Sequence, residues 1–219
     1  MAKKVGVVLS GCGVYDGSEI HEAVITLLAL DRRGADVVVC APDVDQMHVV
    51  NHLTGQATIG ERRNVLVESA RIARGAIRDV AGVSAKELDA LMLPGGFGAA
   101  KNLCDFAVRG PACEVHPEVA RLIREVHEAG KPVAAICIAP AVLAKVLGET
   151  HPELTIGNDA DTAGALEKLG ARHVECPVTE HVVDRERKLV TSPAYMLATR
   201  ISEVETGVEK TIDELLTMA

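Results

Sequence analysis

The sequence has almost no aromatic residues: it contains no Trp, two Phe and two Tyr, although 48% of its 219 residues are hydrophobic. Ala, Val, Leu and Ile must therefore fill the interior, which is typical of a parallel sheet buried between helices. The scarcity of aromatic rings also removes the usual stacking surface for single-stranded nucleic acids.

Basic residues are scarce relative to acidic ones. Lys and Arg number 23 against 31 Asp and Glu, which gives a formal net charge of −8. Nucleic acids and anionic membrane surfaces both attract basic proteins, so this balance argues against either kind of partner. We expect no nucleic-acid partner and no membrane partner.

Long hydrophobic runs and a regular cysteine pattern are also missing. The apolar run at 5–9 is far shorter than a signal-peptide core, and no stretch approaches the roughly 20 apolar residues that span a bilayer. The six cysteines lack the spacing of a disulfide framework and stand at positions 12, 40, 104, 113, 137 and 176. These features predict a cytoplasmic protein with free thiols and a single domain over residues 1–219.

Short apolar runs alternate with amphipathic segments along the chain, which predicts an α/β sandwich with a mostly parallel sheet and helices on both faces. Buried strands are expected at 4–9, 36–41, 88–93 and 132–136, and shorter strands at 76–80, 154–156, 173–176, 182–184 and 188–191. Helices are expected at 20–33, 64–74, 117–129, 138–147, 159–169 and within 195–218, the first of them capped by Ser18. The rest of 43–83 is predicted to be mostly loop.

Three loops follow strands of this predicted sheet, at 10–18, 94–102 and 137–140. Ligands of parallel α/β sheets bind beyond the carboxyl ends of the strands. The three loops are therefore expected to meet in one cleft, although they lie far apart in the sequence.

Cys137 is the strongest candidate nucleophile. It directly follows the buried run 132–136 and precedes a predicted helix, with the small residues Ala134, Ala135 and Ala139 around it. This pattern is typical of a nucleophile elbow, in which a tight turn exposes the side chain. The helix N-terminus is expected to lower the pKa of the thiol. A buried structural cysteine is the alternative interpretation.

Glu22 is the candidate partner of this thiol. On a helical wheel it shares a face with Ile25 and Ala29, so it does not belong to a plainly solvated stripe. A carboxyl group held there would have a raised pKa and could serve as proton donor or base. The alternative role, a first-turn glutamate that favours the helix dipole, fits Glu19 better.

The glycine-rich segment 94–98 (PGGFG) permits a close approach of backbone amides to a bound group. An amide at Gly96 would complement that of Ile138 as a pair of oxyanion donors. A simple tight turn is the alternative interpretation.

Gly11 and Gly13 follow the first predicted strand and imitate the start of a dinucleotide-binding fingerprint. Asp16, however, stands where the third glycine should be, and its carboxylate would face the pyrophosphate. We therefore expect no dinucleotide and no other cofactor.

Metal binding and a second redox thiol are weaker interpretations. His48 and His52 have a spacing compatible with metal ligands on a helix, but Gly55 nearby indicates a turn, and no metal site is expected. Cys12 lies in the first loop and could approach Cys137 as a resolving thiol.

Six motifs together are more specific than any one of them: Ser10–Ala23 (SGCGVYDGSEIHEA), Asn51–Gly55 (NHLTG), Leu93–Leu103 (LPGGFGAAKNL), Cys137–Ala141 (CIAPA), Thr155–Asp159 (TIGND) and Thr191–Met196 (TSPAYM). Over essentially its whole length the chain resembles the ThiJ/PfpI superfamily. Within it, the chain looks like the ElbB-type glyoxalases associated with isoprenoid biosynthesis. The resemblance implies a flavodoxin-like fold of the class I glutamine amidotransferase type.

The resemblance also implies site roles. Cys137 corresponds to the elbow nucleophile, Glu22 to the glutamate that hydrogen-bonds its thiol, and the Gly96 and Ile138 amides to the oxyanion donors. Protease-like members carry a His directly after the cysteine, where this sequence has Ile138. True glutamine amidotransferases carry a catalytic His and Glu late in the chain, and we expect no such pair to serve Cys137 here. Without an imidazole to protonate a leaving amine, amide hydrolysis is disfavoured, whereas an aldehyde has no leaving group.

The expected function is therefore that of a glutathione-independent, glyoxalase-type lyase. It would convert glyoxal, or a related small 2-oxoaldehyde, and water to a 2-hydroxy acid such as glycolate, without a cofactor. A thiol-based redox sensor or regulatory binding protein is one alternative, and a deglycase acting on proteins or nucleotides is another. The superfamily resemblance also implies a homodimer.

Overall fold

The computed structural model describes residues 2–219. Its main sheet has seven strands, which in chain order are β1 (Lys4–Val8), β2 (Asp36–Ala41), β5 (Arg78–Asp79), β6 (Ala90–Leu93), β7 (Val133–Ile136), β10 (Val182–Asp184) and β11 (Leu189–Ser192). In space they follow the order β10-β11-β7-β6-β1-β2-β5. Every neighbouring pair is parallel except the hairpin β10–β11.

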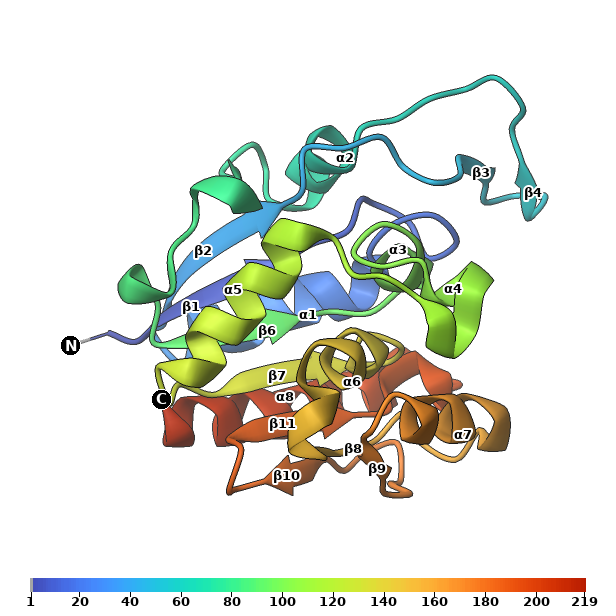
Figure 1. The fold of residues 1–219 in the computed structure, drawn as a ribbon. Coiled ribbons are helices and arrows are strands. Elements are labelled where there is room, and N and C mark those ends of the chain that lie inside the picture. The colour runs from blue at the N-terminus through green and yellow to red at the C-terminus, as the bar shows by residue number, and fades with distance from the viewer. Residues whose placement is uncertain (1) are drawn as a thin grey trace.

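Helices cover both faces of this sheet (Figure 1). The helices are α1 (Ile20–Arg32), α2 (Val65–Ile72), α3 (Phe97–Lys101), α4 (Phe106–Arg109), α5 (Pro117–Glu128), α6 (Pro140–Leu147), α7 (Ala160–Lys168) and α8 (Ile201–Met218). One apolar layer lies between the sheet and α1, α2 and α8, and the other contains side chains from α3 to α7. The predicted three-layer α/β sandwich is thus confirmed.

Side chains of the central strands alternate between the two faces of the sheet, so aliphatic residues fill both layers with few aromatic rings. In β6, Met92 faces the layer that contains α1 and α8, whereas Leu91 and Leu93 face the opposite layer. Successive side chains of a strand point to opposite faces, so a strand covered on both sides is apolar throughout. All four residues of β6 and of β7 are buried.

Two small sheets stand apart from the main one. The hairpin of β3 (Val50–Asn51) and β4 (Gln56–Ala57) projects from the body of the molecule (Figure 1), in a segment that the sequence predicted to be mostly loop. The strands β8 (Glu153–Leu154) and β9 (Arg172–His173) pair with each other, at segments predicted as strands.

Three local predictions are wrong in detail. The N-cap of α1 is Glu19 and not Ser18, because the Ser18 hydroxyl instead accepts the Ser10 amide at 2.8 Å. The predicted loop 94–102 contains the short helix α3. The C-terminal helix α8 begins only at Ile201, after a 3₁₀ turn at 194–196. Within residues 2–219, no helix combines the length and the hydrophobicity needed to cross a membrane.

Candidate active site

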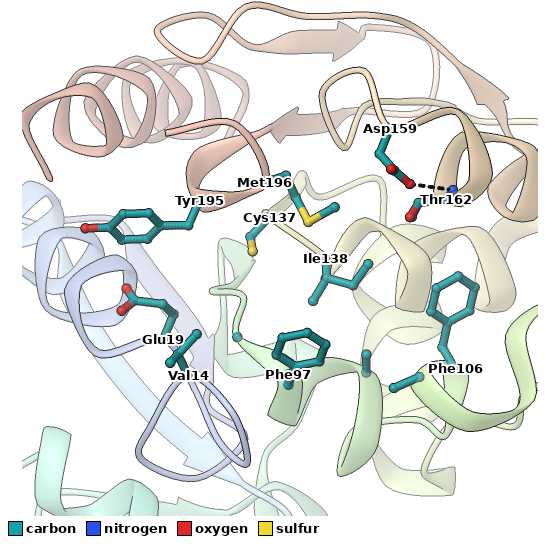
Figure 2. A pocket seen from close by; sticks show the side chains of 13 residues that line it. Val14, Glu19, Phe97, Phe106, Cys137, Ile138, Asp159, Thr162, Tyr195 and Met196 are labelled. Carbon is teal, nitrogen blue, oxygen red and sulfur yellow. Dashed lines mark hydrogen bonds between the residues drawn. The ribbon is translucent and has the colours of Figure 1, made fainter. Parts of the chain in front are cut away.

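A cleft of about 510 Å³ lies beyond the carboxyl ends of β1, β6, β7 and β11, four strands that are adjacent in the sheet. The three loops predicted to meet all line it, through Val14, through Gly96 and Phe97, and through Cys137 and Ile138 (Figure 2). Three further segments, 106–107, 159–162 and 195–196, complete the walls. The predicted meeting of the loops is therefore correct, and the cleft also has walls that were not predicted.

Cys137 stands on a strained turn between β7 and α6. Its φ angle is +60°, a left-handed conformation that non-glycine residues rarely adopt, and its amide donates to the Ser192 carbonyl at 3.0 Å. Such strain concentrates at functional sites, and a strained strand-to-helix turn is the geometry of a nucleophile elbow. The side chain is only 7% exposed and lies in the cleft (Figure 2).

Glu22 lies in the first turn of α1 and is fully buried. Its Oε2 accepts the amide of Gly95 at 2.9 Å, and its Oε1 accepts the amide of Tyr195 at 3.1 Å. The carboxyl group is also within hydrogen-bonding reach of the Cys137 thiol. Two amides from distant segments thus hold the carboxyl group against the sulfur.

Glycine is required where the 94–98 segment passes the Cys137–Glu22 pair. A Cβ on Gly95 would lie 2.3 Å from Cys137 Cβ and 2.6 Å from Glu22 Oε2. At Gly96 φ is +94°, and a Cβ would lie 2.2 Å from the backbone nitrogen of Glu19. The closely spaced glycines of PGGFG therefore permit the chain to pass directly beside the reactive groups.

Burial raises the pKa of Glu22 to about 8, and the neighbouring Glu19 carboxylate adds to this effect. The hydrogen bonds from the Tyr195 amide, the Cys137 thiol and the Gly95 amide act in the opposite direction, but burial dominates. A carboxyl group of this kind can hold or release a proton near neutral pH.

Burial also raises the pKa of Cys137 well above its ordinary value, and the Glu22 carboxyl acts in the same direction. The amides of Gly96 and Ile138 lie against the sulfur and partly oppose this shift. The expectation of a lowered thiol pKa is therefore wrong, because the thiol is buried and this burial outweighs the two amides that lie against the sulfur. The thiol with a lowered pKa is Cys113, brought to about 7 chiefly by its hydrogen bond with Cys104.

Polar contacts hold the loop at residues 10–18 against its surroundings. Asn102 donates to the carbonyls of Ser10 and Asp16, each at 2.8 Å. The buried Asp16 carboxylate accepts the Val50 amide at 2.7 Å, and His52 Nε2 accepts the Tyr15 amide at 3.2 Å. Asp16 and His52 thus attach the β3–β4 hairpin to this loop. No group of three or more His, Cys, Asp or Glu side chains suited to a metal occurs within residues 2–219.

Sequence reasoning missed Tyr195, which supplies an amide to Glu22 and lines the cleft. Its hydroxyl is 2.7 Å from His21 Nδ1, so His21 has a specific contact at the rim of the site. The segment was predicted to be helical, although Pro193 directly after an apolar strand was a signal for another strand-end loop. Cys12 does not line the cleft, and burial raises the pKa of its thiol.

Comparisons with known proteins agree with this fold. The human mitochondrial glutamine amidotransferase-like class 1 domain-containing protein 3 is 50% identical over 98% of this chain and 83% of its own length. The rat mitochondrial ES1 protein homolog is 48% identical over 97% of this chain and 83% of its own length. A crystal structure of an isoprenoid biosynthesis protein with an amidotransferase-like domain from Ehrlichia chaffeensis has a TM-score of 0.91 at 36% identity, covering 99% of this chain and all of that one.

These relatives correct one expectation and settle the family. The prediction of a cytoplasmic location is contradicted, because both mammalian relatives are mitochondrial proteins, and composition alone carries no information about targeting. The model of the DJ-1/PfpI family matches residues 12–198, a range that includes both Glu22 and Cys137. The chain belongs to the DJ-1/PfpI family.

Proposed function

We propose that this protein is a cofactor-independent glyoxalase that converts glyoxal, or a related 2-oxoaldehyde, and water to a 2-hydroxy acid. The observation that carries the proposal is a buried carboxyl group, with a pKa of about 8, held beside an elbow thiol in a cleft. A proton donor and acceptor that works near neutral pH is what an internal proton transfer requires.

The first proposed step is addition of Cys137 to the aldehyde. The Sγ–carbon bond forms as the carbonyl π bond breaks, and the Glu22 carboxylate takes the thiol proton and passes it to the carbonyl oxygen. This gives a hemithioacetal and restores the carboxylate for the next step. The amides of Gly96 and Ile138, which lie against the sulfur in the free enzyme, support this step by donating to the developing oxyanion.

Glu22 then moves a proton from the carbon that bears sulfur to the neighbouring carbonyl carbon, through an enediol. The product of this shift is a thioester of the 2-hydroxy acid. Water cleaves the thioester, which releases the acid and restores the thiol. Oxidation of one carbon balances reduction of the other, so no external electron acceptor takes part.

The composition of the cleft favours this reaction over amide hydrolysis. No histidine lines the cleft within the described residues, and His21, whose imidazole is hydrogen-bonded to the Tyr195 hydroxyl, is not among the lining residues. Amide cleavage needs a group that protonates the leaving amine, whereas the aldehyde reaction expels nothing in its first two steps.

Glu22→Gln tests the role of the carboxyl group. We expect acid formation from glyoxal to fall by about 10²–10⁴-fold, the usual range for loss of a general acid–base group. Reversible adduct formation at Cys137, followed by intact-mass spectrometry, should persist. Glu167→Gln, an exposed glutamate on α7, is the matched control and should retain wild-type turnover.

Cys137→Ala should abolish both the adduct and the acid, whereas Cys176→Ala should affect neither. Near-normal turnover in Glu22→Gln would exclude the proposed mechanism. A stable oxidised form of Cys137 that alters the binding of another protein, without saturable acid formation, would support a redox sensor instead.

A further inference from the structure

The cleft is much larger than glyoxal needs. Its volume of about 510 Å³ lies within the range of about 300–1,000 Å³ that is typical of pockets for drug-sized ligands. Glyoxal is a two-carbon molecule and would occupy only the part of the cleft beside Cys137. The remaining space indicates that the substrate carries a further group.

The walls beyond Cys137 are mostly apolar. From the sulfur the cleft extends past Ile138 toward Phe97 and Phe106 (Figure 2), and Ala107 also lines it. Phe97 is 47% exposed although it lines the cleft, so one edge of this wall is open to solvent and can be covered by a ligand. An apolar arm attached to the aldehyde would remove this surface from water, which stabilises the complex.

The charged groups of the cleft are all acidic. Glu19 lies near the Cys137 end and Asp159 lies at the far end beside Thr162 (Figure 2). No Lys, Arg or His side chain lines the cleft within residues 2–219. Lys101 lies over the ring of Phe97 but is engaged elsewhere, since its amine donates to the Tyr15 carbonyl at 2.9 Å. A carboxylate or phosphate on the substrate would therefore be repelled by the two acidic side chains and would meet no basic side chain in the lining.

We infer that the cleft binds a neutral 2-oxoaldehyde whose carbonyl end reacts at Cys137 and whose apolar arm, about the size of a phenyl ring, packs against Phe97, Ile138 and Phe106. This inference rests on the proposed glyoxalase and specifies its substrate class. Glu19 and Asp159 exclude anionic aldehydes from the same space.

The test compares acid formation from glyoxal, phenylglyoxal and 4-carboxyphenylglyoxal by the wild-type protein and two variants. In Phe97→Ala, the ratio of kcat/KM for phenylglyoxal to kcat/KM for glyoxal should fall about tenfold, because the phenyl ring of the substrate loses part of its apolar contact. Val108→Ala, an exposed apolar position on α4 outside the cleft, is the matched control and should leave the ratio unchanged.

Asp159→Asn tests the exclusion of anions. Asp159 is the N-cap of α7, and Asn caps helices equally well, so the variant removes the charge and keeps the cap. We expect the preference for phenylglyoxal over 4-carboxyphenylglyoxal to fall at least threefold. An unchanged preference would overturn the electrostatic part of the inference, and an unchanged ratio in Phe97→Ala would overturn the apolar part.

A second readout separates this inference from the proposed function. Protection of Cys137 from alkylation, measured by peptide mass spectrometry, reports aldehyde occupancy without turnover. If no aldehyde yields acid, the glyoxalase proposal fails. The substrate class then stands only if phenylglyoxal protects at lower concentration than both other aldehydes and Phe97→Ala weakens this protection. If glyoxal is converted but phenylglyoxal has no advantage in either readout, the inference alone is wrong.

Discussion

Gly95 determines how closely the thiol and the carboxyl group can approach each other. A methyl group there would lie 2.6 Å from Glu22 Oε2 and 2.9 Å from Cys137 Sγ, so Gly95→Ala must push the two groups apart. We expect acid formation to fall by at least about 10²-fold, because misplacement by about 1 Å has such an effect on catalysis. A steady-state assay with glyoxal measures the loss.

Gly164→Ala is the matched control for this substitution. Gly164 lies within α7, where an added Cβ meets nothing within 4 Å. Ala in a helix interior is more favourable than Gly by roughly 0.5–1 kcal/mol, so this variant should unfold at a slightly higher temperature with wild-type activity. Full activity in Gly95→Ala would show that the close contact is not needed.

Glu22 makes the stability of the protein depend on pH. Burial raises its pKa to about 8, whereas an unfolded chain has a value of about 4.3. The stability that Glu22 contributes is therefore fully present below the unfolded pKa of about 4.3, and it is lost as the pH rises toward the folded pKa of about 8. From about pH 6 to about pH 7, the free energy of unfolding of the wild type should fall by about 1.4 kcal/mol relative to that of Glu22→Gln, and the decline should become shallower toward pH 8.

Urea unfolding of both proteins across this range measures the difference. Gln leaves one of the two amides that contact Glu22 without an acceptor, so the variant also carries a penalty that does not vary with pH. A difference between the two proteins that stays constant with pH would show that Glu22 is ionised in the folded state.

The candidate residues were predictable to different degrees. Cys137 and Glu22 have local signals, an apolar strand before a short turn and an acidic residue on an apolar helix face. The direction of the Cys137 pKa shift was not predictable, because it depends on burial by segments remote in sequence. Tyr195 acts through its backbone amide, so its side-chain type gives no indication of this contact.

Among the structural elements, Asn102 links the end of α3 to the 10–18 loop and to the segment before the β3–β4 hairpin. Its side chain donates to two carbonyls of the 10–18 loop, and its Oδ1 accepts the Met47 amide, which precedes the β3–β4 hairpin, at 2.9 Å. Asn102→Ala removes these contacts from a buried position and should lower the free energy of unfolding by about 1–3 kcal/mol. Urea unfolding measures this, and KM for glyoxal should rise because the loop lining the cleft is released.

Asn102→Asp separates the two kinds of contact. It keeps the acceptor for Met47 but places a carboxylate against the carbonyls of Ser10 and Asp16. It should therefore destabilise the protein at least as much as Asn102→Ala near neutral pH. A stability equal to that of the wild type in both variants would mean that the loop is held by its backbone contacts alone.

The buried strands were the most predictable elements, because β1, β2, β6 and β7 are apolar runs with few polar interruptions. The short helix α3 was not predictable from the sequence, because the glycines of PGGFG normally favour a turn. It forms because tertiary contacts hold its start: the Phe97 amide donates to the Val14 carbonyl and the Gly98 amide to the Gly17 carbonyl, each at 2.8 Å. Such contacts between distant loops leave no periodic pattern in a sequence.

For the whole molecule, we expect a homodimer. Ile20, Val24 and Leu28 form an apolar stripe along α1 and are 43%, 48% and 42% exposed. A two-fold symmetric pair would bury the same stripe on both subunits. Light scattering at micromolar concentration should give twice the chain mass of 23.1 kDa. Val24→Glu should yield monomers, whereas Val108→Glu, outside the stripe, should not; a monomeric wild type would contradict this prediction.

The cleft is assembled from six segments that extend from Val14 to Met196. A nascent chain that has not yet supplied the Tyr195 amide cannot hold Glu22 as the folded protein does, and its Cys137 is an ordinary cysteine. Completion of the chain thus brings the carboxyl group and the thiol together. Under the proposed function, a ribosome-bound or partly unfolded molecule should form acid from glyoxal no faster than a free cysteine does, because it lacks the positioned carboxyl group that transfers the proton.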